Sequence, residues 1–340
     1  MKKADLLLFS DIHCGVNNIQ EFRKNWMEAF DVCKKNGIKD IVIGGDIFTA
    51  QASQTLPVLL AVKEMFVTGS KNGLHFDVAS GNHDRPNKEN PESYCHLYDT
   101  IENVNVVDEY ALFDYESYVF GVISYFPENG SFKNRLDRLI SECDNLGYDL
   151  KKTILYIHEG VKGALGGLEL DTECDVEWFK DFAHVLCGHY HNRIKLKGTN
   201  VEYIGSSRQA NFGEDELKGY TIVFDDGSYE FVQNESNLRY RTVKADFGDD
   251  LSIDNDPRYK TRLQLNCTDA EGKTVNKDKL IEMGYNKVEL KTERIKSVET
   301  KDANIEQRYD KIGIKREYKS FCNTKEIEPE LGLKYLDKID

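Results

Sequence analysis

Five short apolar runs of the sequence each end in side chains that can bind a metal ion. The runs are LLLFS, IVIGG, FDVASG, ILYI and HVLCG. The polar residues that follow them are Asp11, His13, Asp46, Asn82, His83, Asp84, His158, His189 and His191. Each short motif is common by chance, but five of the eight histidines of the chain follow these runs. We therefore interpret the ordered set as one metal site.

The mixture of ligand types indicates a site for two divalent ions that acts on a phosphate ester. Two such ions about 3.5–4 Å apart can clamp a phosphoryl group during in-line attack on phosphorus. A carboxylate suits the position between two cations, since it offers two oxygens and offsets their charge. Imidazole nitrogens and an amide oxygen favour Mn²⁺, Fe²⁺ or Zn²⁺ over Ca²⁺. A histidine close to the metals, but not bound to them, can donate a proton to the leaving oxygen.

Strands of a layered α/β fold must bring these residues together. The strands that we predict before the polar residues are Asp5–Phe9, Asp40–Ile43, His75–Ala79, Thr153–Ile157 and His184–Cys187. Functional groups of such folds gather at the carboxyl ends of strands. Side chains alternate along an extended chain, so Asp11 and His13 should point to the same side, as should His189 and His191.

The remaining patterns of the first ~235 residues predict helices and hairpin strands, which completes an α/β layered domain. Apolar residues recur at helical spacing in Asn18–Lys35, Thr55–Val67 and Lys133–Cys143. Four further segments are typical of hairpin strands, the last two joined by an Asp-Asp-Gly turn: Tyr118–Ser124, Val201–Ile204, Tyr220–Phe224 and Tyr229–Val232.

Beyond Arg239 the character of the sequence changes. We expect an acidic linker at Asp246–Asp256, followed by a small α/β unit of strand, helix and strand at Thr261–Asn266, Asn276–Met283 and Lys287–Leu290. The polar stretch Lys296–Gln307 then leads to two helical candidates, Lys315–Phe321 and Pro329–Ile339. The predicted domains are therefore 1–238, 239–295 and 296–340. A helical tail with little apolar surface is more often a docking element than a domain.

Composition limits the class of protein. The 340 residues are 40% hydrophobic and 31% charged, as in an ordinary globular protein. No run approaches the ~20 apolar residues of a membrane span, and the start MKKADLLLFSDIH has too short an apolar run for a signal peptide. The eight cysteines form no CxxC pair, so we expect reduced, buried thiols and a cytoplasmic protein. The net charge of -14 predicts that any contact with DNA is local or depends on a more basic partner.

The motifs DIH, GGD, GNHD, a lone histidine and GHYH, in this order, resemble those of the calcineurin-like metallophosphoesterases. More narrowly, the chain resembles the SbcD-type DNA-repair exonucleases, the nuclease partners of SbcC-type coiled-coil ATPases. The supporting segments are GGDIFTAQAS, SGNHDRP, HEGVKGA and YIGSS, with Phe212, Glu214, Lys218 and Gly219 after them. The resemblance covers roughly residues 1–235, and the length and tail layout are similar to those of phage-encoded recombination nucleases.

The resemblance implies a four-layer αββα sandwich with a small α/β capping domain, which binds DNA, and a helical C-terminal tail. It also implies roles for the motif residues. Asp11, His13 and His191 would hold the first metal ion. The second would be held by Asn82, His158 and His189, with Asp46 bridging the two ions. His83 would be the proton donor and would orient the phosphate, with Asp84 as its partner.

The resemblance further implies the cofactors and partners. Two divalent ions are expected, Mn²⁺ first, with Mg²⁺, Fe²⁺ or Zn²⁺ as alternatives. The tail would bind an SbcC-like coiled-coil ATPase, the substrate would be DNA, and the chain would form a homodimer in the cytoplasm of a bacterium or a phage-infected cell. The chain departs from the family pattern at Ser207, where many relatives have proline. His75, His96 and His184 lie outside the motifs, and we assign them structural roles.

Two other functions remain open from the sequence alone. The first is a phosphoesterase with the same site chemistry, acting on cyclic nucleotides, nucleotides or phosphoproteins. The capping unit and the tail argue against it, since enzymes for small substrates need neither. The second is a scaffold with a relic site, although no ligand of the site is missing.

Overall fold

The computed structural model describes residues 2–165 and 173–292, together with eight single residues between 315 and 333. The expected stretch Lys296–Gln307 lies outside the described residues, as does most of the tail candidate Pro329–Ile339. In the other tail candidate, the described residues Lys315, Tyr318, Lys319 and Phe321 are helical. Within the described residues, none of the helices combines the length and the apolar character needed to cross a membrane.

The first sheet has six strands in the order β12-β11-β1-β2-β3-β4. Strands β1 to β4 are parallel, whereas β11 pairs antiparallel with β1 and with β12. The bounds are β1 Ala4–Phe9, β2 Asp40–Ile43, β3 His75–Ala79, β4 Val104–Val107, β11 Gly219–Phe224 and β12 Tyr229–Gln233. Because β1, β2 and β3 are adjacent and parallel, the three polar loops that follow them emerge at one edge of the sheet.

The second sheet also has six strands, in the order β5-β6-β7-β8-β10-β9. Its bounds are β5 Tyr110–Asp114, β6 Val119–Ile123, β7 Thr153–Ile157, β8 His184–Cys187, β9 Ile194–Lys195 and β10 Val201–Tyr203. Strands β7 and β8 are adjacent and parallel, which places the loops of His158 and of His189 side by side.

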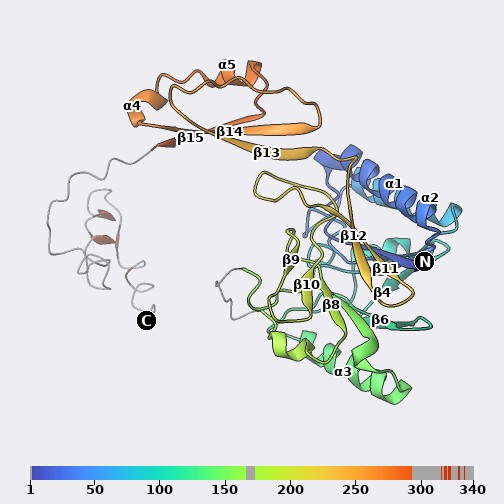
Figure 1. The fold of residues 1–340 in the computed structure, drawn as a ribbon. Coiled ribbons are helices and arrows are strands. Elements are labelled where there is room, and N and C mark those ends of the chain that lie inside the picture. Colours follow the sequence, from blue (N-terminus) through green and yellow to red (C-terminus); the bar gives the residue numbers. More distant parts are fainter. Residues whose placement is uncertain are drawn as a thin grey trace. The chain divides into compact units, whose positions relative to one another are not determined.

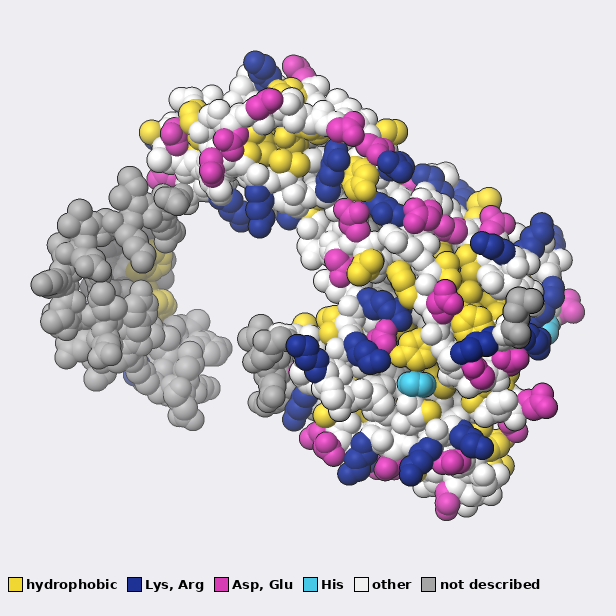
Figure 2. Space-filling view, in the orientation of Figure 1, with side chains coloured by type: hydrophobic (Ala, Val, Ile, Leu, Met, Phe, Trp, Pro, Cys, Tyr) yellow, Lys and Arg dark blue, Asp and Glu magenta, His cyan; other side chains and the backbone are white. Residues whose placement is uncertain are grey.

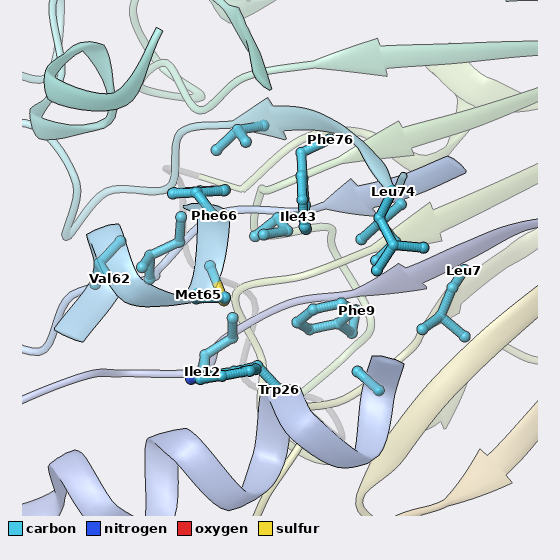
Figure 3. Packing of buried hydrophobic residues seen from close by; sticks show 14 of the residues in the cluster. Leu7, Phe9, Ile12, Trp26, Ile43, Val62, Met65, Phe66, Leu74 and Phe76 are labelled. Carbon is cyan, nitrogen blue, oxygen red and sulfur yellow. The ribbon is translucent and has the colours of Figure 1, made fainter. Parts of the chain in front are cut away.

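Three apolar cores separate four layers, as expected for an αββα sandwich (Figure 1). Helices α1 (Ile19–Asn36) and α2 (Leu56–Lys71) pack on the outer face of the first sheet, and α3 (Phe132–Leu146) packs on the second. Figure 3 shows Trp26 of α1 and Met65 of α2 among the side chains of the strands. The middle core lies between the two sheets and includes Leu8 and Tyr156.

Local sequence explains the two long helices that end in a left-handed residue. In α1 the buried side chains Phe22, Trp26, Ala29 and Cys33 recur at helical spacing, so one face of the helix is apolar. The helix ends at Gly37, whose φ of 71° favours glycine, and its N–H donates to the carbonyl of Cys33. Helix α3 also has buried side chains at helical spacing, and it likewise ends at a left-handed glycine, Gly147.

Four strands were not predicted: β4, β5, β9 and β13 (Arg239–Asp246). They are short or lack a clear apolar alternation, so pairing with neighbouring strands, not local pattern, determines them. The hairpin interpretation was also incomplete for two predicted strands. Strand β6 pairs parallel with β7, and β10 pairs parallel with β8, in addition to their antiparallel neighbours.

The described strands that follow residue 238 form a three-stranded sheet in the order β13-β14-β15. Its elements are β14 Tyr259–Cys267, α4 Asp269–Gly272, α5 Lys277–Glu282 and β15 Lys287–Thr292. The segment predicted as a linker, Asp246–Asp256, connects β13 to β14 and so lies between two strands of one sheet. The described residues form two compact units: the first comprises 2–243, 251–263 and 278–288, and the second comprises 244–250, 264–277 and the described residues from 289 onward.

Short 3-10 helices and free cysteines complete the description. The 3-10 helices are η1 Val16–Asn18, η2 Tyr94–Tyr98, η3 Leu150–Lys152 and η4 Val176–Phe179. All eight cysteines are free and buried. Burial raises the pKa of Cys14 and of Cys33 to about 12, so these thiols are protonated at neutral pH.

Candidate metal centre

Two groups of three side chains could each hold a metal ion. The ligand atoms within each group lie within 4.8 Å of one another. We call Asp11, His13 and His191 the first group, and Asp46, His158 and His189 the second group. These six residues follow β1, β2, β7 and β8, so both sheets contribute to the centre. The residues predicted as ligands from separate runs of the sequence therefore converge in the fold.

Asp46 lies between the two groups. Its Oδ2 atom is 3.7 Å from Nε2 of His13 and 3.4 Å from Nε2 of His158. Its Oδ1 atom accepts a hydrogen bond of 2.8 Å from the N–H of His83. Asp11 also faces both groups, since its Oδ1 is 3.7 Å from Nε2 of His191 and 4.0 Å from Nε2 of His158. The two groups therefore form one site.

Three histidines present the same nitrogen to this site. Nδ1 of His13 lies 3.1 Å from the carbonyl of Phe48, and Nδ1 of His158 lies 2.8 Å from the carbonyl of Gly44. A carbonyl can only accept, so we assign a proton to Nδ1 of both rings, which leaves Nε2 as the ligand atom. His191 has its Nδ1 2.8 Å from Oε1 of Glu214, which directs its Nε2 inward in the same way.

The surroundings of the Nε2 atoms of His13, His158 and His191 favour a bound metal ion. Nε2 of His158 is buried and has no hydrogen-bond partner among the described residues. Its charged neighbour is Oδ2 of Asp46, at 3.4 Å, and a divalent cation could be held by both atoms. Nε2 of His13 and Nε2 of His191 face each other at 3.0 Å. The donor set of carboxylates and imidazoles suits a borderline divalent ion.

Asn82 and His83 come from the loop after β3. Oδ1 of Asn82 lies 3.0 Å from Nδ1 of His189, so the asparagine adjoins the second group. Nδ1 of His83 lies 2.8 Å from the carbonyl of Thr49, and its ring is 5.1 Å from that of His13, edge to face. His83 is partly exposed, so its Nε2 can meet a substrate at the rim of the site.

Asp84 has partners other than the expected one. It is fully buried, and its two oxygens accept from the N–H groups of Gly81, at 2.8 Å, and of Phe48, at 3.1 Å. Burial, with Asp46 nearby, raises the pKa of Asp84 to about 7. The carboxyl thus ties the loop after β2 to the loop after β3 and supports His83 through the backbone, whereas the ring of His83 is held by Thr49.

The backbone at the centre is not extended, contrary to the assumption of strand alternation, although Asp11, His13, His189 and His191 all reach the centre. Asp11, His13 and Asp46 have φ values of 55°, 50° and 50°, and His189 has 83°. Non-glycine residues in this region cost on the order of 1–3 kcal/mol each and persist where the surroundings hold them. The N–H of Asp11 donates to the carbonyl of Gly45, and that of His13 to the carbonyl of Asp46. Pairing between two loops therefore turns these side chains inward.

Two glycines allow the loops to approach. A Cβ atom at position 81 would lie 2.1 Å from Oδ1 of Asp46, and one at position 188 would lie 2.2 Å from the hydroxyl oxygen of Tyr156 and 2.8 Å from Nδ1 of His158. These distances are shorter than any ordinary contact. Gly81 and Gly188 are thus required by the proximity of buried site residues, so a larger side chain at either position would displace a candidate ligand.

The charges of the metal-free centre are unevenly distributed. Burial opposes a charge on His158, but Asp46 and Asp11 outweigh it and raise its pKa to about 9. Burial lowers the pKa of His189 to about 4, and the charge of His158 adds to this effect. Burial likewise lowers the pKa of His13. His158 therefore carries a positive charge beside Asp46 and Asp11 at neutral pH, and, against the effect of burial, Glu214 and Asp11 also raise the pKa of His191.

The loop after β10 supplies side chains that position the candidate ligands, and the sequence motifs do not indicate this role. Glu214 contacts the ring of His191, and Nη2 of buried Arg208 donates to the carbonyl of His13 at 2.9 Å. Nζ of Lys218 donates to the carbonyl of His191 at 2.6 Å. The sequence indicates Glu214 and Lys218 only through the family resemblance, because no spacing in one sequence links residue 214 to residue 191.

A cavity of ≈ 380 Å³ adjoins the second group. Asn82 and His189 line it together with the rings of Tyr125 and Tyr190 and the exposed Lys88. The three other histidines lie elsewhere. His75 and His96 contact Asp40 and Asp108, and His184 packs against Tyr229, as expected for structural residues.

Sequence comparison places the chain beside DNA-repair proteins. It is 28% identical over 235 residues to the DNA double-strand break repair protein Mre11 of Sulfurisphaera tokodaii. The aligned region covers 65% of this chain and 57% of the relative. The Mre11 of Thermoplasma acidophilum is 25% identical over 62% of this chain and 58% of its own length. Exonuclease subunit 1 of Enterobacteria phage T4 is 25% identical over 69% of each chain.

Comparisons with family models and with solved structures do not identify a family for the chain. No family model matches the sequence. The crystal structure of Pseudomonas putida nuclease MPE aligns with 65% of this chain and 84% of its own at 13% identity, but its TM-score of 0.31 is too low to carry an argument. The chain thus spans just over half the length of the two Mre11 proteins. At 25–28% identity, its relatives are proteins named for DNA double-strand break repair and as an exonuclease subunit.

Proposed function

We propose that this chain is a metal-dependent DNA nuclease that hydrolyses phosphodiester bonds during DNA repair or recombination. The observation that carries the proposal is the position of Asp46 between two groups of ligands. One of its oxygens is within 4 Å of Nε2 of His13 and of His158, which belong to different groups. A shared carboxylate between two clusters of imidazoles is the arrangement that a dinuclear centre needs.

In this proposal the residues have the roles that the family resemblance implies. Asp11, His13 and His191 hold the first ion, Asn82, His158 and His189 hold the second, and Asp46 bridges. When bound, the ions supply Lewis-acid chemistry that stabilises charge on the phosphoryl group. We expect Mn²⁺, with Mg²⁺, Fe²⁺ or Zn²⁺ as alternatives.

His83 donates a proton to the leaving oxygen in this proposal. The carbonyl of Thr49 accepts from Nδ1–H of His83, so Nε2 faces the substrate, and the ring must be doubly protonated to donate a proton from Nε2. Asp84 supports this geometry by holding the two loops together and is not itself in contact with the reacting atoms.

DNA is the proposed substrate, since the three curated relatives are named as DNA-repair or exonuclease proteins. The cavity beside the second group is lined by the rings of Tyr125 and Tyr190 and by one cation, Lys88, together with the carboxylates of Glu128 and Glu173. Lysine and arginine alternate with acidic residues on the face shown in Figure 2. Contacts with DNA would therefore be local, made near the site and by the predicted capping domain at 239–295.

We further propose that the chain works with an SbcC-like coiled-coil ATPase, bound by the tail at 296–340, and that it forms a homodimer in the cytoplasm. One relative is named a subunit of an exonuclease, which supports a complex. Deletion of residues 315–340 should abolish co-purification with an SbcC-like ATPase, while hydrolysis of a small phosphodiester continues. Co-purification that is unchanged by the deletion would contradict the role of the tail.

End-labelled linear DNA tests the main proposal. We expect Mn²⁺-dependent degradation by the purified chain, measured with and without the ATPase and ATP. Chelation should stop the reaction, and added Mn²⁺ should restore it. Rapid hydrolysis of a cyclic nucleotide, a nucleotide or a phosphopeptide with DNA left intact would favour the other phosphoesterase function. Bound metal without hydrolysis of any phosphodiester would favour a scaffold.

A further inference from the structure

Gln209 joins two parts of the first compact unit that are far apart in the sequence. Its side-chain oxygen accepts a hydrogen bond of 2.7 Å from the N–H of Tyr240, and its Nε2 donates to the carbonyl of Tyr240 at 2.9 Å. The side-chain amide thus pairs with the backbone of β13 as a neighbouring strand would. The N–H of Arg239 donates to the carbonyl of Arg258, just before β14, so Tyr240 directs its groups to the free edge of β13.

The same side chain also holds Glu214. Nε2 of Gln209 donates a second bond, of 2.8 Å, to the main-chain carbonyl of Glu214. The carboxylate of Glu214 is held by the N–H of Ala210 at 2.9 Å and by the amide of Asn211 at 2.6 Å. It then meets Nδ1 of His191 at 2.8 Å. A continuous series of polar contacts therefore runs from β13 to a candidate ligand of the first group.

A second contact strengthens the attachment to this sheet. The ring of Phe212 packs edge to face on Tyr240 at 5.1 Å, and Nη2 of Arg262 donates to the carbonyl of Phe212 at 3.2 Å. Gln209 is only 3% exposed, so water does not compete for its bonds. The backbone of Tyr240 thus restrains the turn at Gln209, and the side chains of Tyr240 and Arg262 restrain it at Phe212, before Glu214.

We infer that Gln209 and Glu214 are positioning residues that make metal binding by the first group depend on the placement of strand β13. Outer carboxylates that orient a histidine ligand typically contribute about 10–100-fold to metal affinity. A displacement of β13 would move Gln209, then Glu214, and would turn the ring of His191 away from Asp11. This inference rests on the proposed metal centre and adds a means of regulation to it.

Calorimetric titration of the full chain with Mn²⁺ tests the inference. The binding step that belongs to the first group is the step that His191→Asn removes. Glu214→Gln should weaken this step by about 10–100-fold, and Gln209→Met by about 2–30-fold. The matched control is Gln20→Met, a substitution of the same kind at an exposed position of α1, which should leave both steps unchanged.

A double variant shows whether Gln209 acts through Glu214. If it does, Gln209→Met should add nothing to the loss already caused by Glu214→Gln. Additive losses, or an unchanged first step in Gln209→Met, would overturn the inference. If the methionine variant does not fold, Gln209→Glu replaces it, because glutamate keeps an acceptor for Tyr240 but lacks both donated bonds. Absence of any Mn²⁺ binding by the unsubstituted chain would instead contradict the proposed function.

Discussion

The two groups of the metal centre are held in different ways. His158 of the second group is completely buried, directly follows a central strand, and carries a positive charge beside Asp46 when no metal is present. His191 of the first group has a side chain that is 27% exposed, and Glu214 orients it from a distant loop. Each group combines two buried residues with one half-buried histidine, so the contrast lies in how His158 and His191 are held.

Removal of the shared carboxylate should have the largest effect, because it affects both groups. Asp46→Asn keeps the size of the side chain but loses the charge between the two sets of ligands. We expect weak binding of both ions and a fall in turnover of at least about 10²–10³-fold, measured by metal analysis and DNA hydrolysis. Asp99→Asn, an exposed substitution of the same type, is the control. Retention of both ions in Asp46→Asn would exclude a bridging role.

His83 belongs to neither group, and its substitution separates catalysis from metal binding. His83→Ala should retain both ions yet lose about 10²–10⁴-fold in turnover, since a general acid contributes that much. Metal content and DNA hydrolysis are measured on the same sample. If the metal content falls in parallel with turnover, His83 is a ligand and the proposed role is wrong.

The stability of the metal-free protein should distinguish the two groups. His158→Asn leaves the buried Asp46 without its cation, and breaking such a pair costs about 3–5 kcal/mol. His191→Asn removes a partly exposed ring and should cost much less. Chemical denaturation in the presence of a chelator measures both. Equal losses of stability would show that the contrast between the buried His158 and the half-buried His191 is not real.

The dependence on pH should give the smallest effect. The pKa of His158 is about 9 in the metal-free fold, above the usual 6.5, so its proton must leave when a metal binds. Affinity at the second group should therefore rise by up to about tenfold per pH unit between pH 7 and 9. The same raised pKa stabilises the metal-free fold below pH 6.5, and this contribution disappears as pH rises through about 9.

Calorimetry in buffers of different ionisation enthalpy measures the protons released at pH 7.5. His158→Asn, in which the titrating group is absent, should release fewer. An affinity of the second group that does not change with pH would contradict a protonated His158.

The positions of the site residues could be predicted because they depend on local sequence. Short apolar runs specify buried parallel strands, and the first polar residue after each run is placed at the same edge of the sheet. The strands β2, β3, β7 and β8 therefore have the predicted bounds, and the residues that follow β1, β2, β7 and β8 meet at one centre.

Only the tertiary structure determined how the loops turn and what supports the ligands. The positive φ values of Asp11, His13 and Asp46 come from hydrogen bonds between separate loops, which the alternation of an isolated strand does not include. The pairing of Asp84 with two backbone N–H groups, and of Glu214 with His191, joins residues from different segments. Such contacts exist only after the sheets have assembled, so no pattern within one segment specifies them.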